Sequence, residues 1–197
     1  MKTIFFILLL FSSQILFAQH TNSASKSGIY VNWQDYKNGK LSYLFNCDSP
    51  SEKIKLNHFL SKNYIDVIQV EKKIRLSKDS IFGYRDCEQK DHRFFFNNDE
   101  EFLIVENKTI IIYVSDVPVI ASTGKVIQLI PTCFFSTTLN SEILPLTINN
   151  LKRAFPNNLQ FHDLLDVEFY GVKDISGYDT IHNMYKVNFL LSQSINQ

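Results

Sequence analysis

The chain has 197 residues, and its 20 basic and 20 acidic side chains cancel, so the net charge is zero when histidine is neutral. A neutral chain gives no electrostatic reason to expect nucleic acid or an anionic membrane surface as a partner. The length suits one ordinary domain or two small ones. The 17 Phe and 9 Tyr are best explained as core residues, with an exposed aromatic patch as the alternative.

The first residues have the pattern of a secretory signal peptide. Lys2 precedes an apolar run from Ile4 to Phe11, and a second apolar patch ends at Ala18. The run is too short for a membrane-spanning helix, which takes about 20 residues. We therefore expect a signal peptide at 1–18, cleavage after Ala18 and no transmembrane segment in the exported chain. The absence of a cysteine near this junction argues against a lipid anchor.

Three cysteines follow the signal segment, and export permits a disulfide between two of them. Cys47 lies in a polar turn and Cys87 at the end of a strand-like run, so both are expected to be accessible. Cys133 lies in an apolar stretch and is expected to be a small buried hydrophobe. We therefore expect a Cys47–Cys87 disulfide, although sequence alone does not supply the distance that a disulfide requires.

The middle of the chain has the alternation of β-strands. After a polar lead-in at 19–27 and a short turn or helix at 33–36, strand-like runs follow one another from about 64 to 135. Their connections are too short for crossover helices, which predicts antiparallel pairing. Pro118 and Pro131 favour a sheet edge or a strand end for the segments that contain them.

The pattern becomes helical near residue 146. Thr147 is a suitable N-cap for one helix, which Pro156 ends, and a second helix is expected from about Asn158 to Phe169 with Gly171 at its C-terminal end. The segment 179–192 has both helical spacing and strand alternation, and helix is favoured because Asp179 can cap it. The predicted fold class is α+β, an N-terminal antiparallel β-meander with two or three C-terminal helices packed on it. We expect a single domain at 28–197, mostly β over 28–145 and mostly helical over 146–197.

Several short motifs resemble a functionally uncharacterised family of small exported proteins of Bacteroidetes-type bacteria. They are Gly28-Ile29-Tyr30 with Asp35-Tyr36-Lys37, Ile81-Phe82-Gly83-Tyr84-Arg85 with Arg93-Phe94, Asn150-Leu151-Lys152-Arg153-Ala154-Phe155, and Tyr185-Lys186-Val187-Asn188. The resemblance spans most of the chain after the signal segment. It implies an envelope or secreted location and supplies no catalytic residues. The chain lacks the C-terminal sorting domain of many surface-delivered proteins of these bacteria, which favours the periplasm over release.

The residues most typical of a binding site lie in the hairpin around 86–91. Arg85 and Arg93 are predicted to approach each other beside Tyr84 and His92, where two guanidinium groups grip a carboxylate, phosphate or sulfated sugar. The alternative is that both arginines face solvent and pair with nearby aspartates. Trp33 is a candidate stacking platform for a sugar, or else part of a small aromatic cluster that closes one end of a sheet.

Motifs for catalysis and metal binding are weak. Cys87 and His92 are close enough in sequence for a thiol nucleophile and its base, but a surface hairpin does not readily exclude water or supply an oxyanion hole. The histidines are scattered, although His162 and His182 on successive helices are placed where they could meet. We expect no metal and no cofactor.

These observations favour a non-catalytic binding or interaction module of the periplasm or cell envelope, with an envelope protein or glycan as its partner. Release from the cell is the alternative location. The alternative function is a small hydrolase of envelope polymers or polysaccharides whose active site the sequence does not identify. A third is a stress or assembly factor without a small ligand.

Overall fold

The computed structural model describes residues 27–57, 62–70, 72–95, 100–120, 127–171 and 174–195. The expected signal peptide at 1–18 and residues 19–26 of the lead-in, which was expected to be disordered over 19–27, lie outside these ranges; Ser27 instead begins the first strand. Within them, no helix combines the length and the apolar character that crossing a membrane requires.

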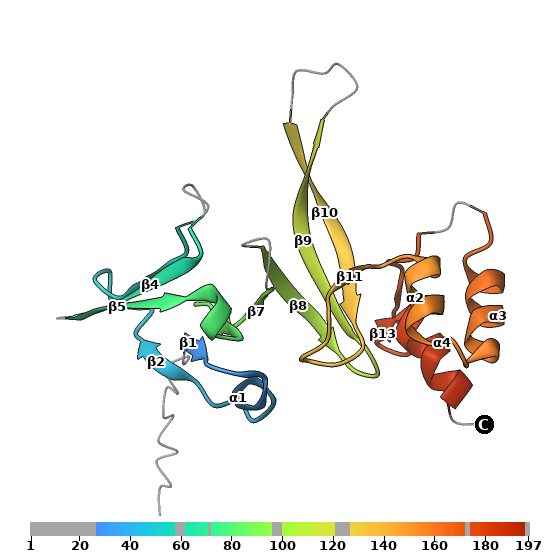
Figure 1. Cartoon of the computed structure of the whole chain (residues 1–197), viewed down its shortest axis with the longest axis horizontal. Helices are drawn as coiled ribbons and strands as arrows, with labels where there is room; N and C mark the ends of the chain where they lie inside the picture. The colour runs from blue at the N-terminus through green and yellow to red at the C-terminus, as the bar shows by residue number, and fades with distance from the viewer. Residues whose placement is uncertain are drawn as a thin grey trace, which may run out of the picture.

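An eight-stranded antiparallel sheet runs through the molecule in the order β11-β10-β9-β8-β7-β6-β1-β2 (Figure 1). Its strands are β1 (Ser27–Tyr30), β2 (Ser42–Phe45), β6 (Gly83–Arg85), β7 (Asp91–Phe94), β8 (Glu101–Asn107), β9 (Ile111–Ile120), β10 (Ile127–Ser136) and β11 (Leu144–Pro145). Short connections join the strands from β6 to β11, and such connections permit only antiparallel neighbours. The α+β class is confirmed at this level: antiparallel sheets dominate, and three of the four described helices follow the strands of the large sheet in the chain.

A second, three-stranded sheet covers the N-terminal end of the large one (Figure 1). It consists of β3 (Lys53–Lys55), β4 (Tyr64–Gln69) and β5 (Lys72–Ser77), and a short 3₁₀ turn, η2 (Lys78–Ser80), leads from it into β6. Ile65 and Val67 of β4 pack against Ile29, Tyr84 and Phe94 of the large sheet. Removing these apolar side chains from water is what holds the two sheets together.

Helices cover the other end of the large sheet. They are α2 (Ile148–Ala154), α3 (Leu159–Glu168) and α4 (Lys186–Ile195), and they bury Leu151, Phe161 and Leu191 against Ile112 and Phe135. Thr147 and Asn158 cap α2 and α3 by accepting hydrogen bonds from backbone N–H groups three residues on, and Gly171 beyond α3 has a φ of 81°. The two helices expected from 148 to 169 are therefore confirmed.

The preference for a helix over 179–192 was wrong for the first part of that segment. β12 (Tyr178–Asp179) and β13 (Met184–Tyr185) form a small hairpin, and α4 begins only at Lys186. The Asp179 carboxylate caps a turn, accepting hydrogen bonds from the backbone N–H groups of Ile181 and His182 at 2.9 and 3.0 Å. The same local bonding that caps helices also stabilises such turns.

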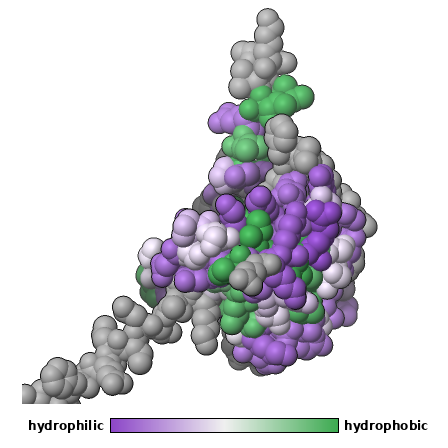
Figure 2. Space-filling model, turned by 90° about the vertical axis from the view of Figure 1, so that its left-hand side faces the viewer, coloured by the Kyte–Doolittle hydropathy of each residue, from purple (hydrophilic) through white to green (hydrophobic). Residues whose placement is uncertain are grey.

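The outer halves of β9 and β10 form a two-stranded arm that projects from the body (Figure 1). Near its tip Ile120 and Ile127 are each 70 % exposed, and apolar residues crowd the arm on the face shown in Figure 2. Pro118 and Pro131 lie in these outer halves, beyond the residues that pair with β8 and β11. The expectation that they occupy sheet edges is confirmed, since no third described strand flanks them.

Candidate functional site

The pairing of β6 with β7 decides on which face of the sheet each candidate residue lies. Gly83 is opposite Arg93, Tyr84 opposite His92, and Arg85 opposite Asp91. Because side chains alternate along a strand, Arg85 and Arg93 share one face while Tyr84 and His92 share the other. The predicted single cluster of these four residues is therefore wrong: the sheet separates it into two pairs.

Arg85 is neutralised by a carboxylate within its own hairpin. Its Nε and Nη2 donate to the two oxygens of Asp91 at 2.7 and 2.9 Å, in the bidentate geometry that suits a guanidinium. Tyr30 donates a further hydrogen bond to Asp91 at 2.9 Å, and its pKa is raised by burial and by the Asp91 charge. The alternative expectation, an arginine paired with an aspartate of the hairpin, holds for Arg85.

Arg93 is instead buried, with 6 % of its surface exposed, so the alternative expectation that both arginines face solvent is wrong for Arg93. Its Nη1 donates to the Tyr113 hydroxyl at 2.7 Å and lies 3.4 Å from Ser136 Oγ, and its Nη2 donates to the Ser141 carbonyl oxygen at 2.8 Å. Three aromatic rings, those of Phe82, Phe95 and Tyr113, lie 5.5 to 5.9 Å from its guanidinium carbon. All of these partners are neutral.

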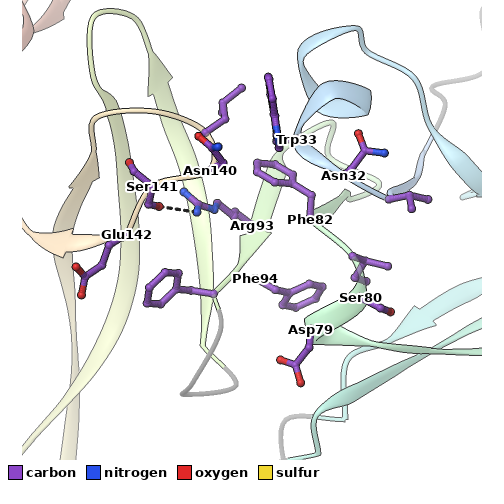
Figure 3. A pocket seen from close by; sticks show the side chains of 14 residues that line it. Asn32, Trp33, Asp79, Ser80, Phe82, Arg93, Phe94, Asn140, Ser141 and Glu142 are labelled. Carbon is purple, nitrogen blue, oxygen red and sulfur yellow. Dashed lines mark hydrogen bonds between the residues drawn. The ribbon is translucent and has the colours of Figure 1, made fainter.

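A cavity of about 510 Å³ opens beside Arg93. Trp33 and Phe82 lie on one side of it and Asn140 and Ser141 on the other, with Arg93 between them (Figure 3). Of the remaining lining residues, five are apolar and four are polar or acidic: Val31, Ile81, Phe94, Phe95 and Leu139, and Asn32, Asp79, Ser80 and Glu142. The volume falls in the range of about 300–1,000 Å³ that is typical of small-molecule sites.

A short helix, α1 (Trp33–Lys37), presents Trp33 to this cavity. Asn32 caps the helix by accepting the backbone N–H of Asp35 at 2.9 Å, which fixes where the helix begins. Tyr36 of the same helix stacks on Phe82, with ring centroids 5.1 Å apart. Burial, followed by the nearby charge of Asp91, raises the pKa of Tyr36 to about 12. Trp33 thus lies on a helix that is packed in place, and it lines the same cavity as Arg93. Both side chains are therefore positioned to contact one ligand.

Tyr84 and His92 lie outside this cavity, on the opposite face. Their rings stack at 4.6 Å, and Tyr84 donates a hydrogen bond to Glu101. His92 bridges two carboxylates, with Nε2 2.9 Å from Asp86 and Nδ1 2.7 Å from Glu101. Burial lowers the pKa of His92, but the hydrogen bonds to Glu101 and Asp86 outweigh it and raise the pKa above its ordinary value of 6.5.

This arrangement makes His92 a poor general base. Both ring nitrogens face carboxylates, so the protonated ring that donates from both is favoured. His92 and Glu101 border a second hollow of about 640 Å³, which Glu100 and Asp116 also line. Neither Trp33 nor Arg93 borders this second hollow.

Cys47 and Cys87 form a disulfide, the pairing that the sequence favoured. The bond ties the loop after β2 to the β6–β7 turn and removes Cys87 as a thiol nucleophile. Cys133 is a free thiol, half-buried against the core below the helices, and burial raises its pKa.

The described residues contain no group of three or more His, Cys, Asp or Glu side chains placed to hold a metal ion. His162 and His182, whose meeting was the less favoured interpretation beside that of separate surface histidines, have separate partners. His162 Nε2 is 2.9 Å from the Phe155 carbonyl oxygen, and His182 Nδ1 is 2.8 Å from Asp179.

Sequence reasoning missed one whole wall of the cavity. Leu139, Asn140, Ser141 and Glu142 belong to the connection between β10 and β11, a polar segment with no motif that marks it. Two aromatic lining residues carry a clearer signal, since Phe94 directly follows the candidate Arg93 and Phe82 lies two residues before the candidate Tyr84.

Comparisons with models of protein families, with curated proteins and with solved structures found no match for this chain.

Proposed function

We propose that this is an exported, non-catalytic binding protein of the periplasm or cell envelope whose ligand enters the cavity between Trp33 and Arg93. The observation that carries the proposal is the meeting of these two side chains, far apart in sequence, in one cavity with mostly apolar walls. A concave, largely apolar site with a few convergent polar groups is the usual form of a ligand site.

Export is supported by two independent features. The leader at 1–18 has the charge and apolar pattern of a signal peptide, and the Cys47–Cys87 disulfide suits an oxidising compartment. Both agree with the proposed membership in a family of small exported Bacteroidetes-type proteins.

An envelope protein or glycan remains the proposed partner class. Trp33 supplies a face on which a sugar ring or an apolar side chain stacks, and Asn32, Asn140 and Glu142 supply polar groups around it. The alternative, a hydrolase, gains little from its two named candidates. Cys87 is oxidised, and both nitrogens of His92 are occupied.

The test uses the fluorescence of Trp33, which is the only tryptophan of the chain and so reports directly on the cavity. The purified chain is titrated with N-acetylglucosamine oligomers and with neutral aromatic amides such as 3-phenylpropionamide. We expect saturable changes in Trp33 emission with at least one probe. Substituting Leu139→Ser in the opposite wall should weaken them, whereas Val70→Ser, at an exposed position that does not line the cavity, should not.

A Trp33 emission that no probe alters would contradict the proposed site. Hydrolysis of the oligomers during the titration, followed by chromatography, would instead favour the hydrolase.

A further inference from the structure

Arg93 is buried but forms no salt bridge within the described part of the chain. Salt bridges with a carboxylate there involve other cations, Arg85 among them, and every hydrogen-bond acceptor on Arg93 is a neutral oxygen. Arginines this deeply buried are almost always paired, because an uncompensated buried charge costs several kcal/mol. Aromatic rings and neutral oxygens offset only part of that cost.

The guanidinium also has donors to spare. It carries five N–H bonds, and the described partners take two from Nη1 and one from Nη2. The Nε–H and one N–H of Nη2 are left, and these two nitrogens lie on one edge of the guanidinium. Arg85 uses that same pair of nitrogens to hold Asp91. In this chain, the edge formed by Nε and Nη2 of an arginine thus already binds a carboxylate.

We propose that the cavity binds a ligand with a carboxylate on an apolar body, and that Arg93 receives the carboxylate. This inference rests on the proposed function and adds the chemical class of the ligand. The walls formed by Trp33, Phe82 and Phe94 enclose the apolar body, while the guanidinium donates hydrogen bonds to the carboxylate head group.

The other charges around the cavity select a single negative charge over a multiple one. Asp79 and Glu142 line the cavity as well, and Arg93 is the only cationic side chain among the lining residues that the structure describes. A phosphate or a sulfated sugar with several charges would face both carboxylates with one guanidinium to balance it. The single charge of a monoanion is balanced by the one guanidinium, and the two oxygens of a carboxylate match the planar edge of that guanidinium.

Two sources offer this chemistry: a free organic acid and the carboxyl terminus of a peptide. The probes therefore include 3-phenylpropionate for the first and N-acetyl-phenylalanine for the second. Each acid is compared with its own amide, which keeps the shape and removes the charge, and phenyl phosphate represents the dianions. Binding is read from Trp33 fluorescence of the purified chain.

We expect each acid that binds to do so at least about tenfold more tightly than its amide, since charge-assisted hydrogen bonds are at stake. The preference should vanish in Arg93→Lys, which keeps the charge and loses the planar edge, and in Arg93→Met. It should persist in Arg85→Lys, the matched control on the same face. The tighter of the two acids identifies the source.

Equal binding of acids and amides would overturn the carboxylate assignment and leave the binding function standing. Tighter binding of phenyl phosphate than of either carboxylate would overturn it too. Because the comparison of acid with amide uses the unaltered chain, the inference stays testable even if the Arg93 variants fail to fold. If the neutral probes of the earlier titration bind and no acid does, the inference fails alone; if nothing binds, both fail.

Discussion

Gly83 lies directly opposite Arg93 in the pairing of β6 with β7, and a Cβ atom at position 83 would overlap the carbonyl oxygen of His92. The two backbones approach so closely only because Gly83 has no side chain. The position of β7, and with it the depth at which Arg93 is buried, therefore depends on a glycine in the neighbouring strand.

Replacing Gly83 by alanine should destabilise the protein by about 1–3 kcal/mol, the usual cost of forcing an extra carbon into a packed interior. The obstructing atoms are backbone and do not rotate away. Chemical denaturation measures the loss. Gly39→Asn is the matched control, because that glycine has a φ of 62° and open space around it, and asparagine tolerates this conformation. Equal denaturation midpoints for Gly83→Ala and the parent chain would contradict the argument.

Removing the Cys47–Cys87 disulfide should lower the free energy of unfolding by about 2–4 kcal/mol, because the bond closes a long loop in the unfolded chain. The linked residues are 40 positions apart. Cys47→Ser with Cys87→Ser is compared with the parent chain in denaturant, with and without reductant. The control, Cys133→Ala, keeps the bond and should remain sensitive to reductant. Insensitivity of the parent chain to reductant would count against a stabilising role.

His92 bridges Asp86 and Glu101, and this arrangement should make the free energy of unfolding fall at both high and low pH. The raised pKa of His92 contributes stability that is complete below pH 6.5, its ordinary value, and is lost as pH rises through the folded pKa. For Asp86, burial raises the pKa, but hydrogen bonds from His92 and the Lys90 backbone outweigh it and lower the pKa below 3.8. Its contribution is present above 3.8 and is lost as pH falls through the folded pKa.

His92→Gln should flatten the alkaline side of this profile, and His162→Gln, far from the bridge, should leave it unchanged. An NMR titration of the His92 ring should give a midpoint above 6.5. A midpoint at or below that value would show that burial outweighs the two carboxylates.

The two prolines of the arm should keep it from pairing with other chains. The Cys133 carbonyl points outward from the β9–β10 pair to accept the Leu146 N–H at 3.0 Å, so the backbone nitrogen of Pro131, two residues earlier, also faces outward. Leu129, two residues before Pro131, faces outward in the same way, and Pro118 is its partner in β9. The backbone nitrogen of Pro118 therefore faces outward too, along the free edge of β9. Neither position offers a donor to an incoming strand.

Pro118→Thr with Pro131→Thr should therefore raise the tendency to self-associate, which analytical ultracentrifugation at increasing concentration detects. Pro50→Thr, in a loop away from the arm, is the control. A double variant that sediments as the parent does would show that the faces of the arm, rather than its edges, govern association.

The elements that the sequence predicted well are those whose signals are local. Thr147, Asn158 and Gly171 mark helix ends through bonds within a few residues, and the structure places the helices there. The segment after Asp179 carried two conflicting periodicities, and its first part became a hairpin because a turn and a helix start use the same capping bond.

The candidate site depended on contacts that no local pattern reveals. Arg93 was a reasonable candidate from its position in a hairpin, but its burial follows from Tyr113, Ser136 and Ser141, which later strands and a loop bring over it. Arg85, a few residues away, found its aspartate within the hairpin, so the same reasoning that succeeded for Arg85 failed for Arg93.

The last helix completes the middle of the sheet. The buried amide of Asn188 in α4 accepts the Ile110 N–H at 2.9 Å and donates to the Ile110 carbonyl and to Glu106, at 3.1 and 2.6 Å. The backbone N–H and carbonyl of Ile110, in the β8–β9 turn, are thus hydrogen-bonded by a residue 78 positions later in the sequence. A chain synthesised only as far as α3 leaves these buried polar groups without their partner, so native folding of this part of the sheet requires α4.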